Sequence, residues 1–370
     1  MIRSLTLKGT KGIFDLPLVA AVFVLLFFGL VMIYDATVVA ALRDFGDKLY
    51  FFKNQLVWAS VGIIAMFMLG FFDYHKILKY APIILAVALI LLILVLVPHI
   101  GTKVYGARRW INIGSFTFQP SEFAKLALVF YQGHIMSKFQ NAKIKLFDIF
   151  YVLFLPLFLL TALVILEPDL GSALIFAGIV LVMYFIGGGK LWHFFLMLPP
   201  LIAGALFAII TQPYRIERLK AFLDPSYDPQ GASYQINQIL IALSSGGLLG
   251  VGIGGSRGKF DFIPEVHSDA IFAVVAEELG FAGAAAFIVL MLFLISRAIK
   301  IARYAKDYEG KLIASGIVAL LSIQTFLNLA SIVALIPLTG IPLPFISAGG
   351  SSMVVTLVSI GILLNIKRQS

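Results

Sequence analysis

One carboxylate stands where a polar segment meets a long apolar run. Asp269 occupies that point in PEVHSDAIFAVVAEELG. A carboxylate that stays ionised yet is only partly hydrated suits general-base chemistry, so Asp269 is the candidate catalytic residue. Alternatively, Ser268 or Asp269 caps the helix that follows, where an acid gains from the helix dipole. The two roles are compatible, because a cap would keep the base ionised.

Two further acids follow on the same predicted helix. Glu277 lies eight residues after Asp269, on the same helical face. Glu278 points about 100° away, so both side chains cannot line one cleft. We therefore take Glu277 as a candidate substrate-binding residue. One of the two acids is expected to have a structural role.

An acid and a base are spaced three residues apart in QPSEFAKLALVF. Glu122 and Lys125 share one helix face there, and Pro120 with Ser121 is typical of a helix start. One interpretation is a polar cleft lined by the pair, because charged groups near membrane depth usually face a cavity or a partner. The other is a structural ion pair that locks two helices together.

Cationic side chains suited to phosphate lie in VYGARRWINIG. Arg108 and Arg109 carry forked donors that fit phosphate oxygens, although anchoring beside Trp110 explains them equally well. His267 could carry a proton or bind a metal, but five histidines without paired spacing argue against a metal site. The chain has no P-loop or dinucleotide fingerprint, so its substrate must arrive already activated. In a membrane, such a substrate is expected to be lipid-linked.

Composition identifies what must hold these residues in place. The 370 residues are 61% hydrophobic and 13% charged, with a mean hydropathy of +1.01. Soluble domains carry about 25% charged residues, so this composition excludes an ordinary soluble enzyme, and its hydrophobicity excludes disorder. Continuous apolar runs exclude a membrane β-barrel, whose strands alternate. The sequence predicts an all-α polytopic membrane protein with no cysteine.

Ten apolar runs predict about ten transmembrane helices in a single membrane domain, 1–370. They cover about residues 16–38, 52–72, 81–98, 120–137, 149–166, 171–187, 191–211, 270–296, 312–335 and 349–366. The one long connection, about 212–269, joins spans seven and eight. It contains two amphipathic stretches, YRIERLKAFL and YQINQILIAL, and a glycine-rich SSGGLLGVGIGGSRG.

The charges orient the bundle. An even number of spans puts both termini on one side, and the loops on that side hold more Lys and Arg residues than the other loops. The positive-inside rule therefore predicts cytoplasmic termini and an extracytoplasmic long loop. The net charge of +9 is explained by this topology, so no nucleic-acid partner is expected.

Motifs in this order resemble the FtsW/RodA/SpoVE (SEDS) family, and the FtsW branch most. They are GARRWINIG, QPSEFAKL, EPDLGSA, RLKAFLDPSYDPQGASYQINQ, IALSSGGLLGVGIGGS, FIPEVHSDAIFAVVAEELG and GIPLPFISAGGSS. The chain departs from the family at Ser268 and Ala270, where Thr and an aromatic residue are usual, and at Ala348. These departures alter pocket shape and remove no ionisable group.

The resemblance implies a peptidoglycan glycosyltransferase that polymerises lipid II on the outer face of the bacterial cytoplasmic membrane. It also implies a class B penicillin-binding protein as partner, beside the membrane lipids. By motif, Asp269 matches the essential carboxylate, and Glu122 and Lys125 match functional positions. Arg108, Arg109, Lys125 and Arg218 are then candidates to bind the departing pyrophosphate. A divalent cation could assist, although no ligand set is visible.

Two other functions remain open at this point. A lipid II flippase would also need intramembrane charges and a large apolar bundle, but it would want a polar path to the cytoplasmic face, whereas most acids here lie near the outer ends of the runs. A scaffold that only positions a penicillin-binding protein would depend on lipid-facing helix surfaces instead.

Overall fold

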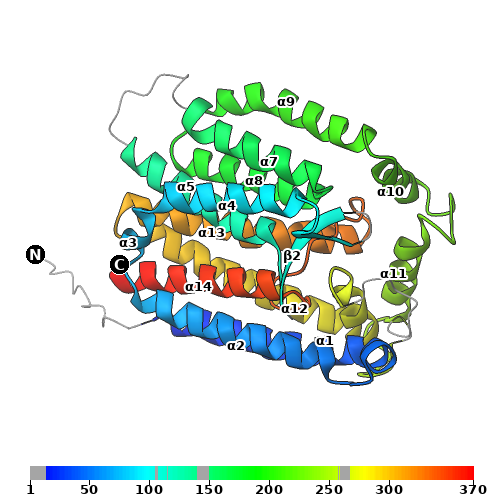
Figure 1. Cartoon of the computed structure of the whole chain (residues 1–370). Coiled ribbons are helices and arrows are strands. Elements are labelled where there is room, and N and C mark those ends of the chain that lie inside the picture. Colours follow the sequence, from blue (N-terminus) through cyan, green and yellow to red (C-terminus); the bar gives the residue numbers. More distant parts are fainter. Residues whose placement is uncertain (1–13, 105–106, 115, 140–149, 257, 259–266) are drawn as a thin grey trace, which may run out of the picture.

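The chain folds into a bundle of helices with roughly parallel axes (Figure 1). The computed structural model describes residues 14–104, 107–114, 116–139, 150–256, 258 and 267–370. The long helices are α1 (Leu16–Phe45), α2 (Tyr50–Phe71), α4 (Ala81–Leu96), α5 (Pro120–Lys138), α7 (Leu155–Leu166), α8 (Leu170–Ile186), α9 (Leu191–Ile210), α12 (Ile271–Arg303), α13 (Tyr308–Ile332) and α14 (Gly350–Gln369). A short helix α3 (Tyr74–Leu78) follows α2, and a π-helical turn (Phe150–Phe154) leads into α7.

Each of the ten predicted apolar runs coincides with one of these helices. Within the described ranges, five of them, α1, α2, α12, α13 and α14, are long and apolar enough to cross a bilayer, and three shorter apolar helices accompany them. Large apolar side chains such as Phe27, Ile64 and Phe158 point outward from the bundle. Such an extensive exposed apolar surface is unfavourable in water and favourable in contact with lipid. The chain is therefore a multi-pass membrane protein.

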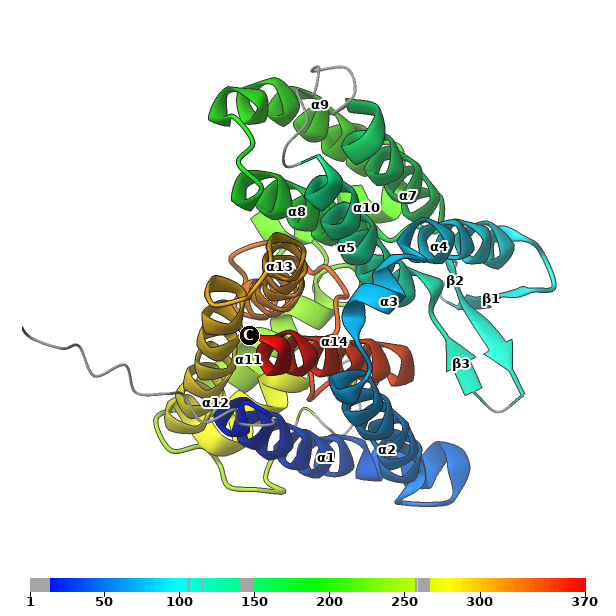
Figure 2. The ribbon, with the colours of Figure 1, turned by 90° about the vertical axis from the view of Figure 1, so that its left-hand side faces the viewer.

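Two helices form the centre of the bundle. About two thirds of the most apolar window of α13 and over three quarters of that of α14 are buried by other helices, against about a quarter for α2 and α12. Figure 2 shows α14 near the middle of the bundle and α13 between α8 and α12, with α12 at the edge. Polar side chains in the buried parts of α13 and α14, such as Gln324, Asn328 and Asn365, are therefore shielded from lipid.

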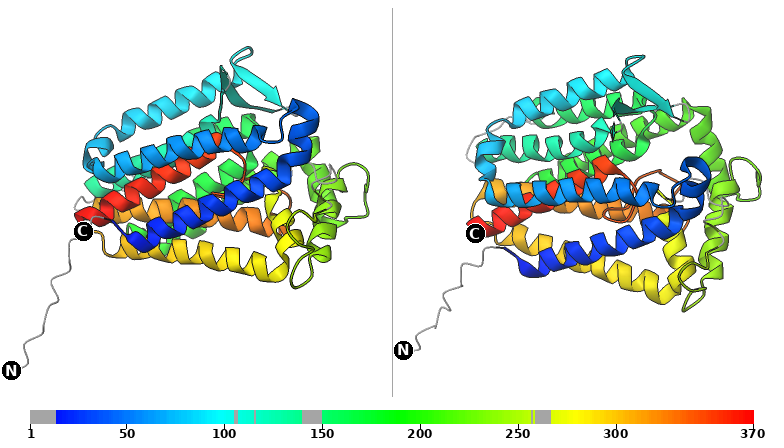
Figure 3. Two further views of the ribbon diagram at one scale, coloured as in Figure 1. Left: turned by 90° about the horizontal axis from the view of Figure 1, so that it is seen from below. Right: turned by 60° about the horizontal axis from the view of Figure 1, so that its bottom comes forward.

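The start of α1 and the end of α14 lie at the same end of the bundle (Figure 3). We call this the inner end and the opposite one the outer end. At the inner end, Arg297 Nη2 lies 2.6 Å from Asp15 Oδ2, and Tyr74 Oη donates to Asp307 Oδ2 at 2.5 Å. These contacts join α12 to α1 and α3 to the start of α13.

A small antiparallel sheet at the outer end departs from the predicted all-α fold. It consists of β1 (Gly101–Val104), β2 (Ala107–Ile113) and β3 (Phe116–Phe118), in that order. The strands form because Trp110, Ile111 and Ile113 favour extended backbone and turn residues separate the short segments. The apolar runs predict only a loop between α4 and α5, so the sheet is a departure from the prediction.

The two amphipathic stretches of the long connection are helices, as the sequence predicts. They are α10 (Pro213–Leu223) and α11 (Tyr234–Ser245). Both lie across the outer end of the bundle (Figure 1). Their position places the long connection on the side opposite the chain ends.

The helix α12 is broken at Gly280, which has φ +64° and ψ −168°. Because the helix is interrupted there, backbone carbonyls in the turn before Gly280 lack their usual N–H donors from the following turn. The carbonyls of Glu277 and Glu278 accept hydrogen bonds from the N–H groups of Val251 and Gly252 instead, each at 3.0 Å. The glycine-rich loop, Gly246–Ser256, thus supplies donors to the end of the first half of α12.

The second half of α12 is joined to the same loop. Phe281 N donates to Gly247 O at 2.9 Å and Ala282 N to Leu248 O at 3.0 Å. A Cβ at Gly250 would lie 2.0 Å from the Glu278 carbonyl oxygen, which only glycine avoids. The loop and the helix break are therefore one structural unit, closed by these backbone hydrogen bonds.

We expect Gly280→Ala to lower the thermal stability of the purified protein. A Cβ there would lie 2.3 Å from Gly250 N, and the positive φ adds about 1–3 kcal/mol of strain. The matched control is Gly204→Ala in α9, where an added Cβ meets nothing within 4 Å. Thermal unfolding in detergent should show a clear decrease for the first variant and none for the second; equal midpoints would contradict the role given to the break.

Candidate functional site

Asp269 lies at the outer end, just before α12. Its side chain is partly exposed, and its Oδ1 accepts a hydrogen bond from Ser268 Oγ at 3.2 Å. The predicted capping role is wrong, because the N-cap is Ala270 and no side-chain oxygen in the described residues caps the first turn. The amide of Asn328, on α13, donates to Asp269 O and to Ile341 O, both at 2.8 Å. That clamp fixes the backbone while leaving the carboxylate at the surface.

The connection between α13 and α14, residues 333–349, packs beside this carboxylate. A Cβ added at Gly340 would lie 3.8 Å from Asp269 Oδ2. Further along, Ala348 N donates to His267 O at 2.8 Å. The 333–349 connection therefore contacts both residues that the sequence singled out before α12.

The imidazole ring of His267 packs against an aromatic side chain. Its centroid lies 4.9 Å from that of Phe51, near the start of α2. This contact and the backbone bond to Ala348 hold His267 against α2 and the 333–349 connection. A role for its ring in substrate binding stays a prediction.

Glu122 and Lys125 form a buried ion pair. Lys125 Nζ lies 2.6 Å from Glu122 Oε1, with exposed fractions of 1% and 2% for the two residues. Lys125 Nζ also donates to Gln324 Oε1 at 3.4 Å, and Gln324 Nε2 donates to Pro342 O at 3.0 Å. Gln324 is one helical turn from Asn328 on α13. The pair is thus linked to the connection that borders Asp269, and it joins α5 to α13.

The two adjacent arginines contact backbone carbonyls. On β2, Arg109 Nε donates to Glu167 O at 3.1 Å and its Nη2 to Pro168 O. Arg108 Nη1 donates to Leu96 O at 3.5 Å. Both side chains are partly exposed, and they tie the sheet to the ends of α7 and α4. Phosphate binding by either arginine stays a prediction, since these contacts give them a structural task as well.

Arg218 lies on α10 at the edge of a hollow between α10 and α11. Its Nη1 donates to Leu338 O at 2.9 Å, and its guanidinium lies 5.0 Å from the ring centroid of Tyr214. The hollow has a volume of about 260 Å³ and is also lined by Glu217 and Gln235. Arg218 therefore joins α10 to the 333–349 connection and faces open space.

One buried cation in this region was not among the predicted site residues. Arg215 is 5% exposed, and its Nη1 donates to Ala208 O at 2.6 Å. Its Nε and Nη2 have no hydrogen-bond partner in the described residues. In Arg297, the Nε and Nη2 atoms donate to the two oxygens of the Asp15 carboxylate. The corresponding Nε and Nη2 atoms of Arg215 are therefore suited to bind an oxyanion. Only the position of Arg215 in PYRIERL, three residues before Arg218, could have indicated it.

The carboxylates of Glu277 and Glu278 contact the glycine-rich loop and Gly258, two residues beyond it. Glu277 Oε2 accepts from Ser256 Oγ at 2.5 Å and from Gly258 N at 3.4 Å. Glu278 Oε1 accepts from Ser256 N at 3.1 Å. Both residues are buried, and both hold the loop. Both acids therefore contribute to the fold, and a role for Glu277 in substrate binding stays a prediction.

Two buried acids occupy the outer turn between α7 and α8. Asp169 accepts from Ser172 N at 2.9 Å and Ser172 Oγ at 2.7 Å, so it caps α8. Glu167 is fully buried, and neither carboxyl oxygen has a hydrogen-bond partner in the described residues. Burial and the Asp169 charge raise the pKa of Glu167 to about 9, although the Arg109 charge opposes this. Glu167 is therefore a neutral acid at physiological pH. The EPDLGSA motif identified the position of Glu167 but did not indicate that its carboxyl group is protonated.

We expect Glu167→Gln to stabilise the protein at alkaline pH. The unfolded chain releases the Glu167 proton above about 4.5, whereas the folded chain keeps it until about 9. The free energy of unfolding should therefore fall with rising pH in that window, by up to about 1.4 kcal/mol per pH unit. Glutamine removes this dependence. The thermal unfolding midpoints of the wild-type and Glu167→Gln proteins should be similar at pH 5 and should differ increasingly up to pH 9. Glu217→Gln, at an exposed position, is the control. A midpoint difference between wild type and Glu167→Gln that does not change with pH would contradict a neutral Glu167.

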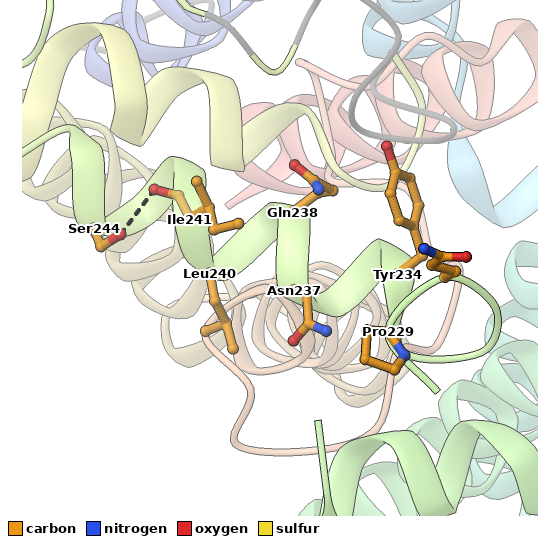
Figure 4. A pocket seen from close by; sticks show the side chains of 8 residues that line it. Pro229, Tyr234, Asn237, Gln238, Leu240, Ile241 and Ser244 are labelled. Carbon is orange, nitrogen blue, oxygen red and sulfur yellow. Dashed lines mark hydrogen bonds between the residues drawn. The ribbon is translucent and has the colours of Figure 1, made fainter. Parts of the chain in front are cut away.

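A second hollow, of about 530 Å³, lies along α11 (Figure 4). Tyr234, Asn237 and Gln238 line it, together with Leu240 and Ile241. Asn237 Nδ2 also donates to Pro225 O at 2.9 Å. The outer end thus offers neutral amide and phenol groups near the cationic hollow of Arg218.

A divalent cation has no evident ligand set in the part of the chain that the structure describes. There, no group of three or more His, Asp or Glu side chains is arranged to hold a metal ion. Assistance from a divalent cation stays a prediction.

Comparison with known proteins places this arrangement in a family. The family model described as "Cell cycle protein", FtsW/RodA/SpoVE, matches residues 16–370. Stage V sporulation protein E of Bacillus subtilis (strain 168) is 39% identical over 360 residues, covering 96% of this chain and 97% of that protein. A protein of Trichlorobacter lovleyi named "Probable peptidoglycan glycosyltransferase FtsW" is 40% identical over 356 residues, covering 95% and 93%.

Solved structures share the fold. A chain from a structure described as "Structural coordination of polymerization and crosslinking by a peptidoglycan synthase complex" has a TM-score of 0.79 at 29% identity, covering 96% of this chain and 98% of that one. The rod shape determining protein RodA of Thermus thermophilus has a TM-score of 0.70 at 28% identity, covering 96% and 97%. The motifs, the helix order and these matches agree: the chain belongs to the FtsW/RodA/SpoVE family.

Proposed function

We propose that this protein is a peptidoglycan glycosyltransferase that polymerises lipid II on the outer face of the cytoplasmic membrane, during cell division or cell-wall growth. Relatives named as probable peptidoglycan glycosyltransferases support the reaction class. The observation that carries the proposal is the position of Asp269. Asp269 is partly exposed at the outer end, beside the 333–349 connection, to which the buried Glu122–Lys125 pair is linked through Gln324.

The reaction is a single inverting displacement. The 4-hydroxyl oxygen of the acceptor sugar attacks the anomeric carbon of the donor sugar, which is α-linked to undecaprenyl pyrophosphate. A β-1,4 C–O bond forms as the bond to the pyrophosphate oxygen breaks. Asp269 takes the hydroxyl proton, and the pyrophosphate departs with the bonding electrons. The start of α12 two residues later favours a negative charge at this position.

Cations near the outer end would stabilise the departing pyrophosphate. Arg218 faces a hollow beside the connection that borders Asp269, so it fits this role best. Arg108 and Arg109 are partly exposed on the neighbouring sheet. Lys125 is 1% exposed and already paired, so its contribution would be to hold the site and not to contact phosphate.

The partner would be a class B penicillin-binding protein that supplies the transpeptidase. The structural relative from a peptidoglycan synthase complex supports such an assembly. Both termini would lie in the cytoplasm, consistent with the excess of Lys and Arg residues on their side of the bundle. The glycan would then grow outside the membrane, where the partner could use it.

Purified protein in proteoliposomes tests polymerisation against transport. Fluorescent lipid II would be included with the protein and a class B partner, and both chain length and lipid accessibility to an external quencher would be measured. We expect glycan strands and no protein-dependent lipid movement. A flippase would move lipid II without chain growth, and that result would overturn the proposal.

A further inference from the structure

The glycine-rich loop, Gly246–Ser256, presents a dense apolar surface to its surroundings. Leu248, Leu249, Val251 and Ile253 are 75%, 83%, 47% and 73% exposed. These large apolar side chains, all within one short segment, point away from the protein. The segment SSGGLLGVGIGGS contains no charged residue. Such a surface is costly in water and typical of contact with lipid or a protein.

The backbone of this loop suits an apolar environment. Within hydrocarbon, a backbone N–H or C=O without a partner costs several kcal/mol, so irregular segments enter a membrane only where protein satisfies them. Here backbone groups of the loop bond to the broken turn of α12, as described above. Gly250 N donates to Gly246 O at 2.8 Å and Gly255 N to Gly252 O at 3.0 Å, so the loop also forms backbone hydrogen bonds within itself.

The position of the loop along α12 sets its depth. Residues 281–296, between the break and the Arg297–Asp15 pair at the inner end, rise about 24 Å at 1.5 Å per residue, against a hydrocarbon core of about 30 Å. Gly280 therefore lies near the outer boundary of that core. The loop is hydrogen-bonded to the residues on both sides of Gly280, so it lies at the same level.

The exposed loop continues the lipid-facing surface of α12. Phe281, directly after the break, is 69% exposed, and Val289 and Leu292 further along the helix are 64% and 58% exposed. Figure 2 shows α12 at the edge of the bundle, with the yellow-green chain of the loop beyond it. An apolar surface contiguous with a helix already in contact with lipid is itself favoured to contact lipid.

From these observations we propose that the glycine-rich loop inserts Leu248, Leu249 and Ile253 into the acyl region of the outer leaflet. The loop is a membrane anchor clamped to the α12 break. Through Glu277 and Glu278 it holds the first half of α12, whose start follows Asp269, level with the lipid head groups. The proposal rests on the loop geometry and is independent of the proposed enzymatic activity.

The absence of cysteine makes a direct test simple. Leu249→Cys gives a protein with a single thiol, which is labelled with an environment-sensitive NBD fluorophore. The labelled protein alone is reconstituted into vesicles of phosphatidylethanolamine and phosphatidylglycerol, with and without doxyl-labelled lipids. Ile253→Cys provides a second labelled position that should behave like position 249. The matched control is Ser226→Cys, in the exposed turn after α10.

We expect blue-shifted NBD emission at position 249 and quenching of at least about twofold by doxyl groups on the acyl chain, with little quenching at position 226. Equal, water-like spectra at both positions would overturn the proposal. Shielding at 249 that develops only after a class B penicillin-binding protein is added would also overturn it, because the surface would then be a protein-docking site.

Discussion

Asp269→Asn is expected to reduce lipid II polymerisation by at least about a hundredfold while leaving the protein folded. Asparagine keeps the shape of the side chain and removes the ability to accept the acceptor hydroxyl proton, and general-base catalysis is typically worth about 10²–10⁴-fold. The backbone clamp from Asn328 to Asp269 O does not involve the carboxylate, so it should survive. The rate is measured with labelled lipid II in the presence of a class B partner.

A second carboxylate in the long connection serves as the control. Asp224 is exposed, and its Oδ1 accepts from Ser226 N at 2.9 Å. Asp224→Asn should retain polymerisation at close to the wild-type rate. Thermal unfolding of all three proteins checks folding. Wild-type polymerisation by a folded Asp269→Asn protein would contradict the assignment of the base.

Lys125→Met is expected to cause the largest loss of stability, of about 3–5 kcal/mol. The substitution leaves the Glu122 carboxylate buried without its cation, and an uncompensated buried charge is strongly destabilising. The double variant Glu122→Gln with Lys125→Met removes both charges and should recover most of the loss. Thermal unfolding midpoints in detergent measure both effects. Additive losses in the double variant would contradict a coupled pair.

The same double variant separates the two interpretations of the pair. If the pair only locks α5 to α13, polymerisation should return together with stability. If the charges act on the substrate, the stable double variant should still fail to polymerise lipid II. The contact of Lys125 with Gln324, and of Gln324 with Pro342 O, means that a structural lock would also position the connection beside Asp269.

The helices were predictable because apolar composition alone determines where a chain enters a bilayer. The amphipathic helices α10 and α11 were predictable from their periodicity in the same way. The sheet was missed because its strands are too short for alternation to stand out from loop sequence. The break at Gly280 was missed because a single glycine in AEELGFAG is compatible with a continuous helix until a partner loop competes for its hydrogen bonds.

The candidate site was predictable as a set of residue types but not as a set of contacts. The position of Asp269 at the end of an apolar run located the surface carboxylate. The 333–349 connection, which contacts Asp269, His267 and Arg218, is distant from all of them in sequence. Gln324 and Asn328, two amide residues one turn apart in a predominantly apolar helix, were the available signal for that packing.

The most direct test of the central claim is polymerisation in detergent, where no second compartment exists and transport cannot occur. Purified protein and a class B partner inactive in any glycosyltransfer of its own are mixed with labelled lipid II, and the products are separated by length. A ladder of glycan strands from the wild-type protein, and none from Asp269→Asn, is the predicted result. Unchanged lipid II in both reactions, or equal ladders from both, would contradict the account.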